Sequence, residues 1–484
     1  MGFLQKIYQC CILFFIVTSA TAQNVDVSTG AADKLLANFK DSSAKIIIHH
    51  INITGNRRTK SYIILREIQF KSGDSLSITT LNSELQNARQ QVYNTNLFNE
   101  VKIELSTTAD NEIDVNFLVK ERWYIFPIPK FQLIDRNINE WLQKYNGNLE
   151  RVVYGIKFTH YNLSGRRDLL RLIFLNGFTR NISFSYSQPF VNKKLTHGFS
   201  FGGGFIENRE HIYKTGYDNK PLLFNNGDYS RKNMYVSTAY TIRKNILQSH
   251  AFSITYNHLQ VADSLLNKVV YNPNYFGSSN PIQNYVDFSY TNQYINTNNA
   301  VYPLKGITAM IKVLKRGFGF SGDVNMFFVE GNFNKYWPLG KEWYGSINAS
   351  AKTTLPFNQP YINQRAMGYG EQYLRGLELY VVDGVAYGLL RSTLKKKLYT
   401  LHVPLPFKSK KYNSIPFSFF AKTYADVGYN YNKKQYATNL NNKLLYSGGF
   451  GIDILTLYDI NLRVEYSFNQ LGKNGLFLQA QSGL

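Results

Sequence analysis

The feature that most constrains this chain is a period-two alternation of apolar and polar residues, which recurs from about residue 150 to the C-terminus. In INLRVEYSF, residues 460–468, one face carries Ile, Leu, Val, Tyr and Phe, and the other carries Asn, Arg, Glu and Ser. NISFSYSQ (181–188) and VDFSYTNQ (286–293) repeat the pattern. Successive side chains of a β-strand point to opposite faces, so these segments predict strands with one uniformly apolar face.

An apolar, aromatic-rich face repeated over many strands, opposite a polar and modestly charged face, is typical of a transmembrane β-barrel. In lipid every backbone N–H and C=O must be paired within the protein, and a sheet achieves this by closing on itself. Residues 150–484 have room for about 16 antiparallel strands, with 14 as the alternative, because bacterial barrels favour even numbers. After the N-terminus we find no apolar run of the roughly 20 residues that a helical span needs.

The first 22 residues predict a secretory signal peptide, with Lys6 ahead of a short apolar run and Ala20-Thr21-Ala22 as the cleavage motif. The only cysteines, Cys10 and Cys11, lie in this segment, so we expect the mature chain to have no disulfide, thiolate metal site or cysteine nucleophile. Export and alternation together predict the outer membrane of a bacterial cell. The formal net charge of +22 then suits anionic lipid headgroups or anionic solutes, and we expect no nucleic-acid partner.

Ahead of the barrel the sequence predicts a small separate domain. Residues 23–45 are polar and small, and we expect a disordered lead-in. Residues 46–122 have the predicted order β-α-α-β-β, and the second helix follows from Leu81, Leu85, Ala88 and Val92, which share one helical face. We expect residues 123–149 to be a junction and residues 150–484 to be the barrel.

Two segments of this domain, INITGNRRTKSYIILREIQFKSGD (51–74) and VYNTNLFNEVKIEL (92–105), resemble a POTRA domain, the periplasmic module of outer-membrane assembly and transport barrels. Residues 120–145 are similar to the domain-to-barrel junction of the BamA/TamA family as found in Bacteroidetes-type bacteria. VYPLKG (301–306) resembles a family element that precedes a mid-barrel strand. Because only one POTRA-like unit is found, the chain resembles an accessory or specialised member.

The segment YLRGLELYVVDG (373–384) resembles the family's sixth extracellular loop, and Leu374, Arg375 and Gly376 match its core motif. The resemblance implies that this loop folds into the barrel lumen. An Arg in a lumen is costly unless it is paired, and a bidentate carboxylate holds both its charge and its orientation. A glycine beside it allows a tight turn or a close approach to the wall.

The resemblance also implies the partner of this Arg, which is the Asp of an aromatic-x-D-x-G strand. Here the motif is YADVGY, so Asp426 and Gly428 occupy those positions. A second acidic partner of the family has no counterpart, because the following strand, LLRSTLKKKLY (389–399), contains no Asp or Glu. We expect the basic run Lys395–Lys397 in that strand to lie near a turn as a solvated or headgroup-facing patch.

The resemblance further implies a lateral seam between the first barrel strand (near 151–161) and the last (near 475–484), at Tyr154, Ile156, Leu476, Leu478 and Leu484. An unpaired edge there can template an incoming strand, and the POTRA edge can bind an extended segment by β-augmentation. The implied role is assembly, insertion or translocation of other proteins at the outer membrane, without a cofactor. The implied partners are unfolded outer-membrane or secreted clients, accessory periplasmic or lipoprotein subunits, and outer-membrane lipids.

Other functions leave weaker signals. Neighbouring positions on a strand face opposite sides, and HExxH is absent, so the eight histidines predict no metal site; they are His49, His50, His160, His197, His211, His250, His258 and His402. GxSxG is also absent, and we expect no enzyme, although a Ser-His pair assembled across strands stays open as a hydrolase. The main alternative to the assembly role is a passive, anion-leaning channel or a structural barrel.

Overall fold

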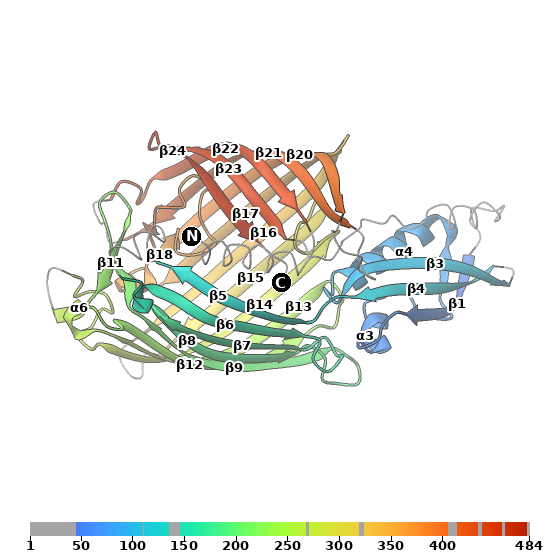
Figure 1. Cartoon of the computed structure of the whole chain (residues 1–484), viewed down its shortest axis with the longest axis horizontal. Helices are drawn as coiled ribbons and strands as arrows, with labels where there is room; N and C mark the ends of the chain where they lie inside the picture. The colour runs from blue at the N-terminus through green and yellow to red at the C-terminus, as the bar shows by residue number, and fades with distance from the viewer. Residues whose placement is uncertain are drawn as a thin grey trace.

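The computed structural model describes residues 45–109, 111–134, 146–267, 271–318, 324–404, 414–433, 438–456 and 460–481. Over these ranges the chain is mostly β, with a small N-terminal domain beside a 16-stranded antiparallel sheet (Figure 1). No helix in the described residues is long and apolar enough to cross a membrane. The barrel end that faces the N-terminal domain is called the near end below, and the opposite end is the distal end.

The N-terminal domain is a four-stranded sheet in the order β2-β1-β4-β3, in which β1 and β4 are parallel. Its buried apolar residues run from Ile46 to Tyr124 and include the predicted helical face of α4. The three-residue strand β2 was not predicted, but the order is otherwise the expected one. Its elements are β1 (Lys45–Thr54), α3 (Ser61–Leu65), β2 (Ser75–Ser77), α4 (Ile78–Tyr93), β3 (Phe98–Ala109) and β4 (Glu112–Glu121).

A β-bulge in β1 overturns the expectation that neighbouring histidines face opposite sides. The register between β1 and β4 shifts between Ile48 and Ile51, so the chain accommodates extra backbone at His49 and His50. The two rings therefore converge, with their centroids 4.0 Å apart. Neighbouring side chains point to opposite faces only where the hydrogen-bond ladder is regular, and the sequence does not show where a bulge interrupts the ladder.

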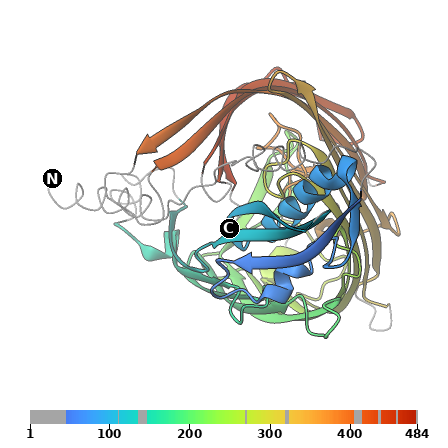
Figure 2. The ribbon, with the colours of Figure 1, turned by 90° about the vertical axis from the view of Figure 1, so that its right-hand side faces the viewer.

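Each barrel strand pairs antiparallel with its neighbours in chain order, and the sheet curls into a barrel (Figure 2). The predicted strand number of 16 is confirmed. The barrel strands are β5 (Ile125–Leu133), β6 (Val152–Tyr161), β7 (Leu169–Gly177), β8 (Thr179–Gln188), β9 (His197–Asn208), β12 (Arg231–Ile242), β13 (Gln248–Val261), β14 (Ile282–Thr297), β15 (Gly306–Arg316), β16 (Met326–Gly340), β17 (Trp343–Leu355), β20 (Ala386–Pro404), β21 (Ser414–Tyr431), β22 (Leu444–Leu455), β23 (Asn461–Asn469) and β24 (Asn474–Gln481).

Short elements occupy the connections between barrel strands. A hairpin lies between β9 and β12, and a second two-stranded piece lies between β17 and β20. These elements are η1 (Leu149–Arg151), β10 (Glu210–Thr215), β11 (Pro221–Asn225), α6 (Asp263–Asn267), η2 (Tyr361–Asn363), β18 (Arg365–Met367) and β19 (Val382–Asp383).

The two faces of the sheet follow the predicted alternation. On β23, Leu462 and Phe468 are 40% and 47% exposed on the outer face. Asn461, Glu465 and Ser467 on the same strand point inward and are each 1% exposed. The apolar face is therefore the outside of the barrel, and the polar face lines a filled interior.

The barrel begins earlier than predicted. Residues 123–149 were expected to be a junction, but they contain β5, which pairs with β6 from Ile125 to Leu133. Tyr154 and Ile156, expected on the first strand, therefore lie on the second, where β5 covers one side of them and β7 the other. The strand in IFPIPKFQL was not predicted, because proline inside an apolar run argues against a central strand. Proline is allowed in an edge strand, and β5 lies at the edge of the sheet.

Candidate functional site

The connection between β17 and β20, residues 356–385, folds back against the inner wall of the barrel, and we call it the latch loop. Leu374 and Leu377 in this loop are 1% and 3% exposed. They pack in one buried cluster with Met367 of the loop and Leu389 of β20. This apolar contact holds the backbone on either side of Arg375 close to the wall.

The structure brings Arg375 and Asp426 together, as the sequence predicts. The Arg375 Nε donates to Asp426 Oδ2 at 2.9 Å, and Nη2 donates to Oδ1 at 2.5 Å. The backbone N–H of Arg375 also donates to Oδ2, at 3.0 Å. The carboxylate side chain is fully buried and the Arg375 side chain is 13% exposed, so this is a bidentate pair largely removed from water.

Neutral acceptors on β20 take the place of the second acid that the sequence lacks. Arg375 Nη1 donates to the hydroxyl of Thr393 at 2.9 Å, and Nη2 donates to the carbonyl of Ser392 at 3.0 Å. The guanidinium also lies over the ring of Tyr424, 4.0 Å from its centroid. Among the described contacts, the guanidinium of Arg375 is therefore held by one carboxylate together with a hydroxyl, a carbonyl and an aromatic ring.

Two motif glycines make room for the latch loop. Gly376 has φ +91°, and a Cβ there would lie 2.9 Å from Cβ of Ser467. A Cβ at Gly428 would lie 3.1 Å from a methyl group of Leu374. One glycine allows the turn and the close approach of the loop, and the other leaves space on the wall for the neighbouring leucine.

The latch loop reaches across the wall from β17 to β24. On one side Ser350 donates to Gln372 at 3.1 Å. On the other side Asn469 of β23 donates to the carbonyl of Gly376 at 2.7 Å, and the Tyr373 hydroxyl donates to Gln479 of β24 at 3.0 Å. The loop thus braces the last barrel strand from inside the lumen.

A second buried charge cluster lies in the lumen nearer the near end, and sequence reasoning missed it. Asp453 of β22 binds Lys422 and, at 3.1 Å, Lys395, while Lys422 also contacts Glu465 at 2.6 Å. Tyr302, within the VYPLKG element, donates to Asp453 across the lumen at 2.8 Å. The expectation of a solvated patch is therefore wrong for Lys395, which points inward. The available signal was the two acids, because Asp453 and Glu465 each have apolar neighbours on both sides in the sequence.

The N-terminal domain is held to the barrel by a cluster of arginines around Glu67, just after α3. Arg243, in the turn after β12, donates to both Glu67 oxygens at 2.5 and 2.9 Å. Arg167, in the turn after β6, lies 3.5 Å from the same carboxylate. Burial pushes the pKa of Glu67 upward, but Arg243, Arg167 and Arg66 together lower it below its ordinary value of 4.5.

Arginines of the domain also bind backbone carbonyls of the near-end turns. Arg66 donates to Leu195 O at 2.9 Å and to Arg243 O at 2.6 Å. Arg58 donates to Asn162 O at 2.8 Å. Three turns of the barrel are therefore contacted from one short stretch of the domain, which lies across the near end in Figure 2.

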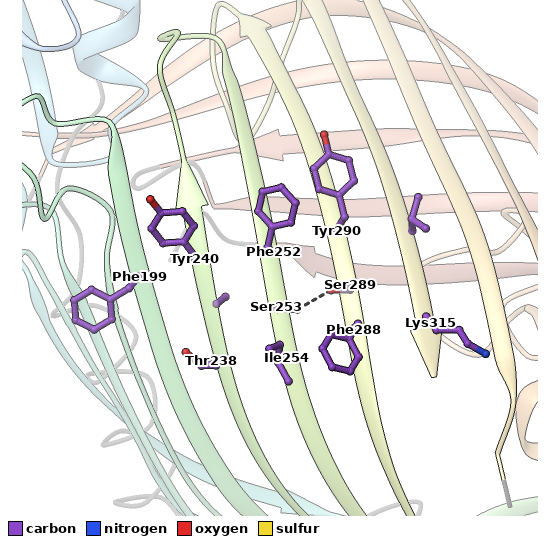
Figure 3. Close-up of a pocket in the computed structure, with 12 residues that line it drawn as sticks. Phe199, Thr238, Tyr240, Phe252, Ser253, Ile254, Phe288, Ser289, Tyr290 and Lys315 are labelled. Atoms are coloured by element: carbon purple, nitrogen blue, oxygen red, sulfur yellow. Dashed lines mark hydrogen bonds between the residues drawn. The ribbon is translucent and has the colours of Figure 1, made fainter. Parts of the chain in front are cut away.

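A shallow depression on the outer face carries none of these groups (Figure 3). Its lining is mostly aromatic and aliphatic and comes from β9 and β12 to β15; Phe199, Tyr240, Phe252 and Phe288 are 38% to 48% exposed. An apolar hollow on the apolar outer face fits lipid chains, and it offers no catalytic constellation.

The two ends of the sheet, β5 and β24, share no ladder among the described residues. Leu476 and Leu478 of β24 lie at this seam as predicted, with side chains 63% and 73% exposed. Leu484, the remaining predicted seam residue, lies outside the described residues.

Comparison with known proteins matches residues 46–122 to the family description "POTRA: Surface antigen variable number repeat". Among solved structures, CdiB from Escherichia coli aligns over 95% of this chain and 78% of its own, with 12% identity and a TM-score of 0.50. BamA from Haemophilus ducreyi lacking POTRA domains 1–3 aligns over 91% and 84%, with 17% identity and a TM-score of 0.49. The chain therefore has a POTRA domain, and its overall fold is similar to that of CdiB.

Proposed function

We propose that this protein assists the assembly, insertion or translocation of other proteins at a bacterial outer membrane, with its POTRA domain in the periplasm. The observation that carries the proposal is the seam: β5 and β24 end a 16-stranded sheet without pairing in the described residues, and β5 directly follows the last strand of the POTRA domain in the chain. A passive pore has no need of such an edge. In lipid, unpaired strand groups are costly, so an edge of this kind favours pairing with another strand.

The three parts of the molecule suit successive steps on one client. The POTRA strand β3 ends its sheet and has no described partner on its outer side, so an extended segment can add to it. The seam then receives a strand from that segment. The latch loop, tied to β24 through Tyr373, keeps the last strand in place on the lumen side while its other edge is used. No step needs a nucleotide or another cofactor.

The test is depletion of the protein in its native cell, with quantitative proteomics of the outer membrane and cell surface. The proposal expects a subset of outer-membrane or secreted proteins to fall in abundance, with rescue by the wild-type chain. If no such protein falls while the depletion itself is verified, the proposal is wrong.

A passive anion-leaning channel is the second candidate, and the net charge of +22 favours it. Conductance in planar bilayers separates the two. A large, steady, anion-selective conductance that Arg375→Ala leaves unchanged supports the channel. Small or flickering conductance that increases in Arg375→Ala supports a lumen held closed by the latch loop.

A further inference from the structure

The hydrogen-bond phase of β5 shows which of its groups face the open side of the seam. Tyr161 N–H donates to Tyr124 O, and Ile134 N–H donates to Arg151 O, at the two ends of an unbroken ladder with β6. In an antiparallel ladder the residues bonded to a given neighbour alternate. Even-numbered residues of β5 therefore bond to β6, and odd-numbered residues direct N–H and C=O toward the open side.

Two of the five residues of β5 that face the open side are prolines. The five are Ile125, Pro127, Pro129, Phe131 and Leu133. Proline has no N–H, so the centre of this edge accepts hydrogen bonds but donates none. The carbonyl of Ile125 is also already bound by the indole N–H of Trp123. The open side of β5 is thus partly blocked against any strand that pairs with it.

On the opposite edge, every outward residue of β24 has both a hydrogen-bond donor and an acceptor. Asn469 N–H donates to Lys473 O, and an unbroken register follows, so odd-numbered residues of β24 bond to β23. The outward positions are then Asn474, Leu476, Leu478 and Ala480, each with an N–H and a C=O. Any pairing of these four with four consecutive outward positions of β5 as described, Ile125 to Leu133, includes both prolines, so closure between the two described strands lacks two bonds.

We propose that the seam is asymmetric: β24 is the edge that pairs with an incoming client strand, and the prolines of β5 keep the barrel from closing on that edge. The client strand is antiparallel to β24 and alternates apolar and polar residues, which continues the outer apolar face of Leu476 and Leu478. This inference rests on the proposed function for its client. The edge assignment itself rests only on the backbone.

The test measures amide hydrogen exchange, residue by residue, on the full mature chain in detergent micelles. We expect the outward amides of Leu476, Leu478 and Ala480 to exchange at least tenfold faster than the β23-bonded amides of Phe477 and Gln479. The double variant Pro127→Val/Pro129→Val restores two donors and should slow the outward amides at least tenfold. Protected outward amides in the wild type, or no slowing in the variant, overturn the proposal.

The partner is tested with a synthetic ten-residue peptide that alternates Leu or Val with Ser or Gln. It should protect the outward amides of β24 and leave those of Phe131 and Leu133 on β5 unchanged. Protection on β5 alone, or no protection at either edge, overturns the partner assignment. Failure of the depletion experiment above would refute the assembly role yet leave the exchange pattern standing, so the two failures are distinguishable.

A second and independent observation concerns the bulge in β1. The Nδ1 atoms of His49 and His50 lie 2.7 Å apart, and Asp114 Oδ1 of β4 lies 3.1 Å from the first and 3.8 Å from the second. The backbone N–H of His50 donates to the same carboxylate oxygen at 3.0 Å, which orients it toward the rings. Three donor atoms of the type that transition metals prefer thus converge on one point.

No arrangement of protons gives each of these contacts a full hydrogen bond of its own, because His49 Nδ1 has either one proton or one lone pair for both neighbours. If His49 Nδ1 carries a proton for Asp114, it has no lone pair for His50. If it instead accepts from His50, its lone pair faces the carboxylate oxygen at 3.1 Å. A cation that accepts a lone pair from each of the three atoms removes this conflict.

We propose that His49, His50 and Asp114 bind a divalent transition metal of the zinc type, with a position left for water or for a donor from a partner. The test is calorimetric titration of the full mature chain with Zn²⁺ alone. We expect one micromolar site that weakens at least tenfold in His50→Ala and in Asp114→Asn, and that His258→Ala leaves unchanged. Absence of saturable binding, or equal binding in all the variants, overturns the proposal; resistance of the N-terminal domain to limited proteolysis verifies that the domain carrying the site is folded in each variant.

Discussion

The pairing of Arg375 with Asp426 predicts that removing the guanidinium releases the latch loop from the wall. Arg375→Ala leaves a fully buried carboxylate without its bidentate partner, and it also removes the bonds to Thr393 and Ser392. Breaking a buried pair by deleting one partner costs about 3–5 kcal/mol. At about 1.4 kcal/mol for each factor of ten, the population in which the latch loop is released should rise by about two to three and a half orders of magnitude.

The assay uses a cysteine beneath the loop. Ser467 is 1% exposed and lies directly under Gly376, so Ser467→Cys reports release as thiol labelling. The chain without residues 1–22 lacks Cys10 and Cys11, which leaves this thiol as the sole label site. When closing is faster than labelling, the labelling rate follows the population of the released state, so Arg375→Ala should label about 100 to 4,000 times faster.

The chain offers a matched control. Arg316 binds Asp287 in the lumen with two bonds of 2.8 Å and also lies over a tyrosine ring, 4.4 Å from its centroid. It does not touch the latch loop among the described contacts, so Arg316→Ala should leave the labelling rate within threefold. If Arg375→Ala also stays within threefold, or if both variants accelerate labelling equally, the pair of Arg375 and Asp426 is not what holds the latch loop against the wall.

Three further predictions concern single contacts. Gly376→Ala places a Cβ at φ +91° in van der Waals conflict with the wall and costs about 1–3 kcal/mol, which the same labelling assay should register as at least a fivefold acceleration. Thr393→Val deletes one acceptor of Arg375 at about 1.5 kcal/mol, so labelling should accelerate about tenfold, and unchanged labelling would show that the hydroxyl is not needed. Glu67→Gln weakens the grip of Arg243 on the POTRA domain, and distances between spin labels on the domain and the barrel should broaden at pH 7. Since the pKa of Glu67 is lowered below 4.5 in the folded protein, its contribution is present above that pH and is lost as pH falls through the lowered pKa; wild-type distances should therefore be constant from pH 8 to 5 and broaden only in stronger acid.

The sequence alone determined the class of fold and part of the site. Alternation is a local property of each strand, so an apolar outer face and a polar inner face follow wherever the period of two persists, as on β23. Arg375 and Asp426 could be paired in advance because YLRGLELYVVDG and YADVGY resemble two motifs whose Arg and Asp are paired in the family, and the pairing is present in the structure. Both conclusions depend on residue type and spacing, which the sequence contains.

The tertiary structure decided the features that depend on pairing between distant segments. Whether IFPIPKFQL is a strand depends on β6 offering it a partner, and its prolines are tolerated only because the other side is an edge. The bulge that turns His49 and His50 together arises from the register between β1 and β4. Thr393 and Ser392 replace the missing acid, and Lys395 points inward, because the barrel wall brings acceptors to them. Register and closure are set by hydrogen bonds across the sheet, and those bonds join residues that a linear pattern does not relate.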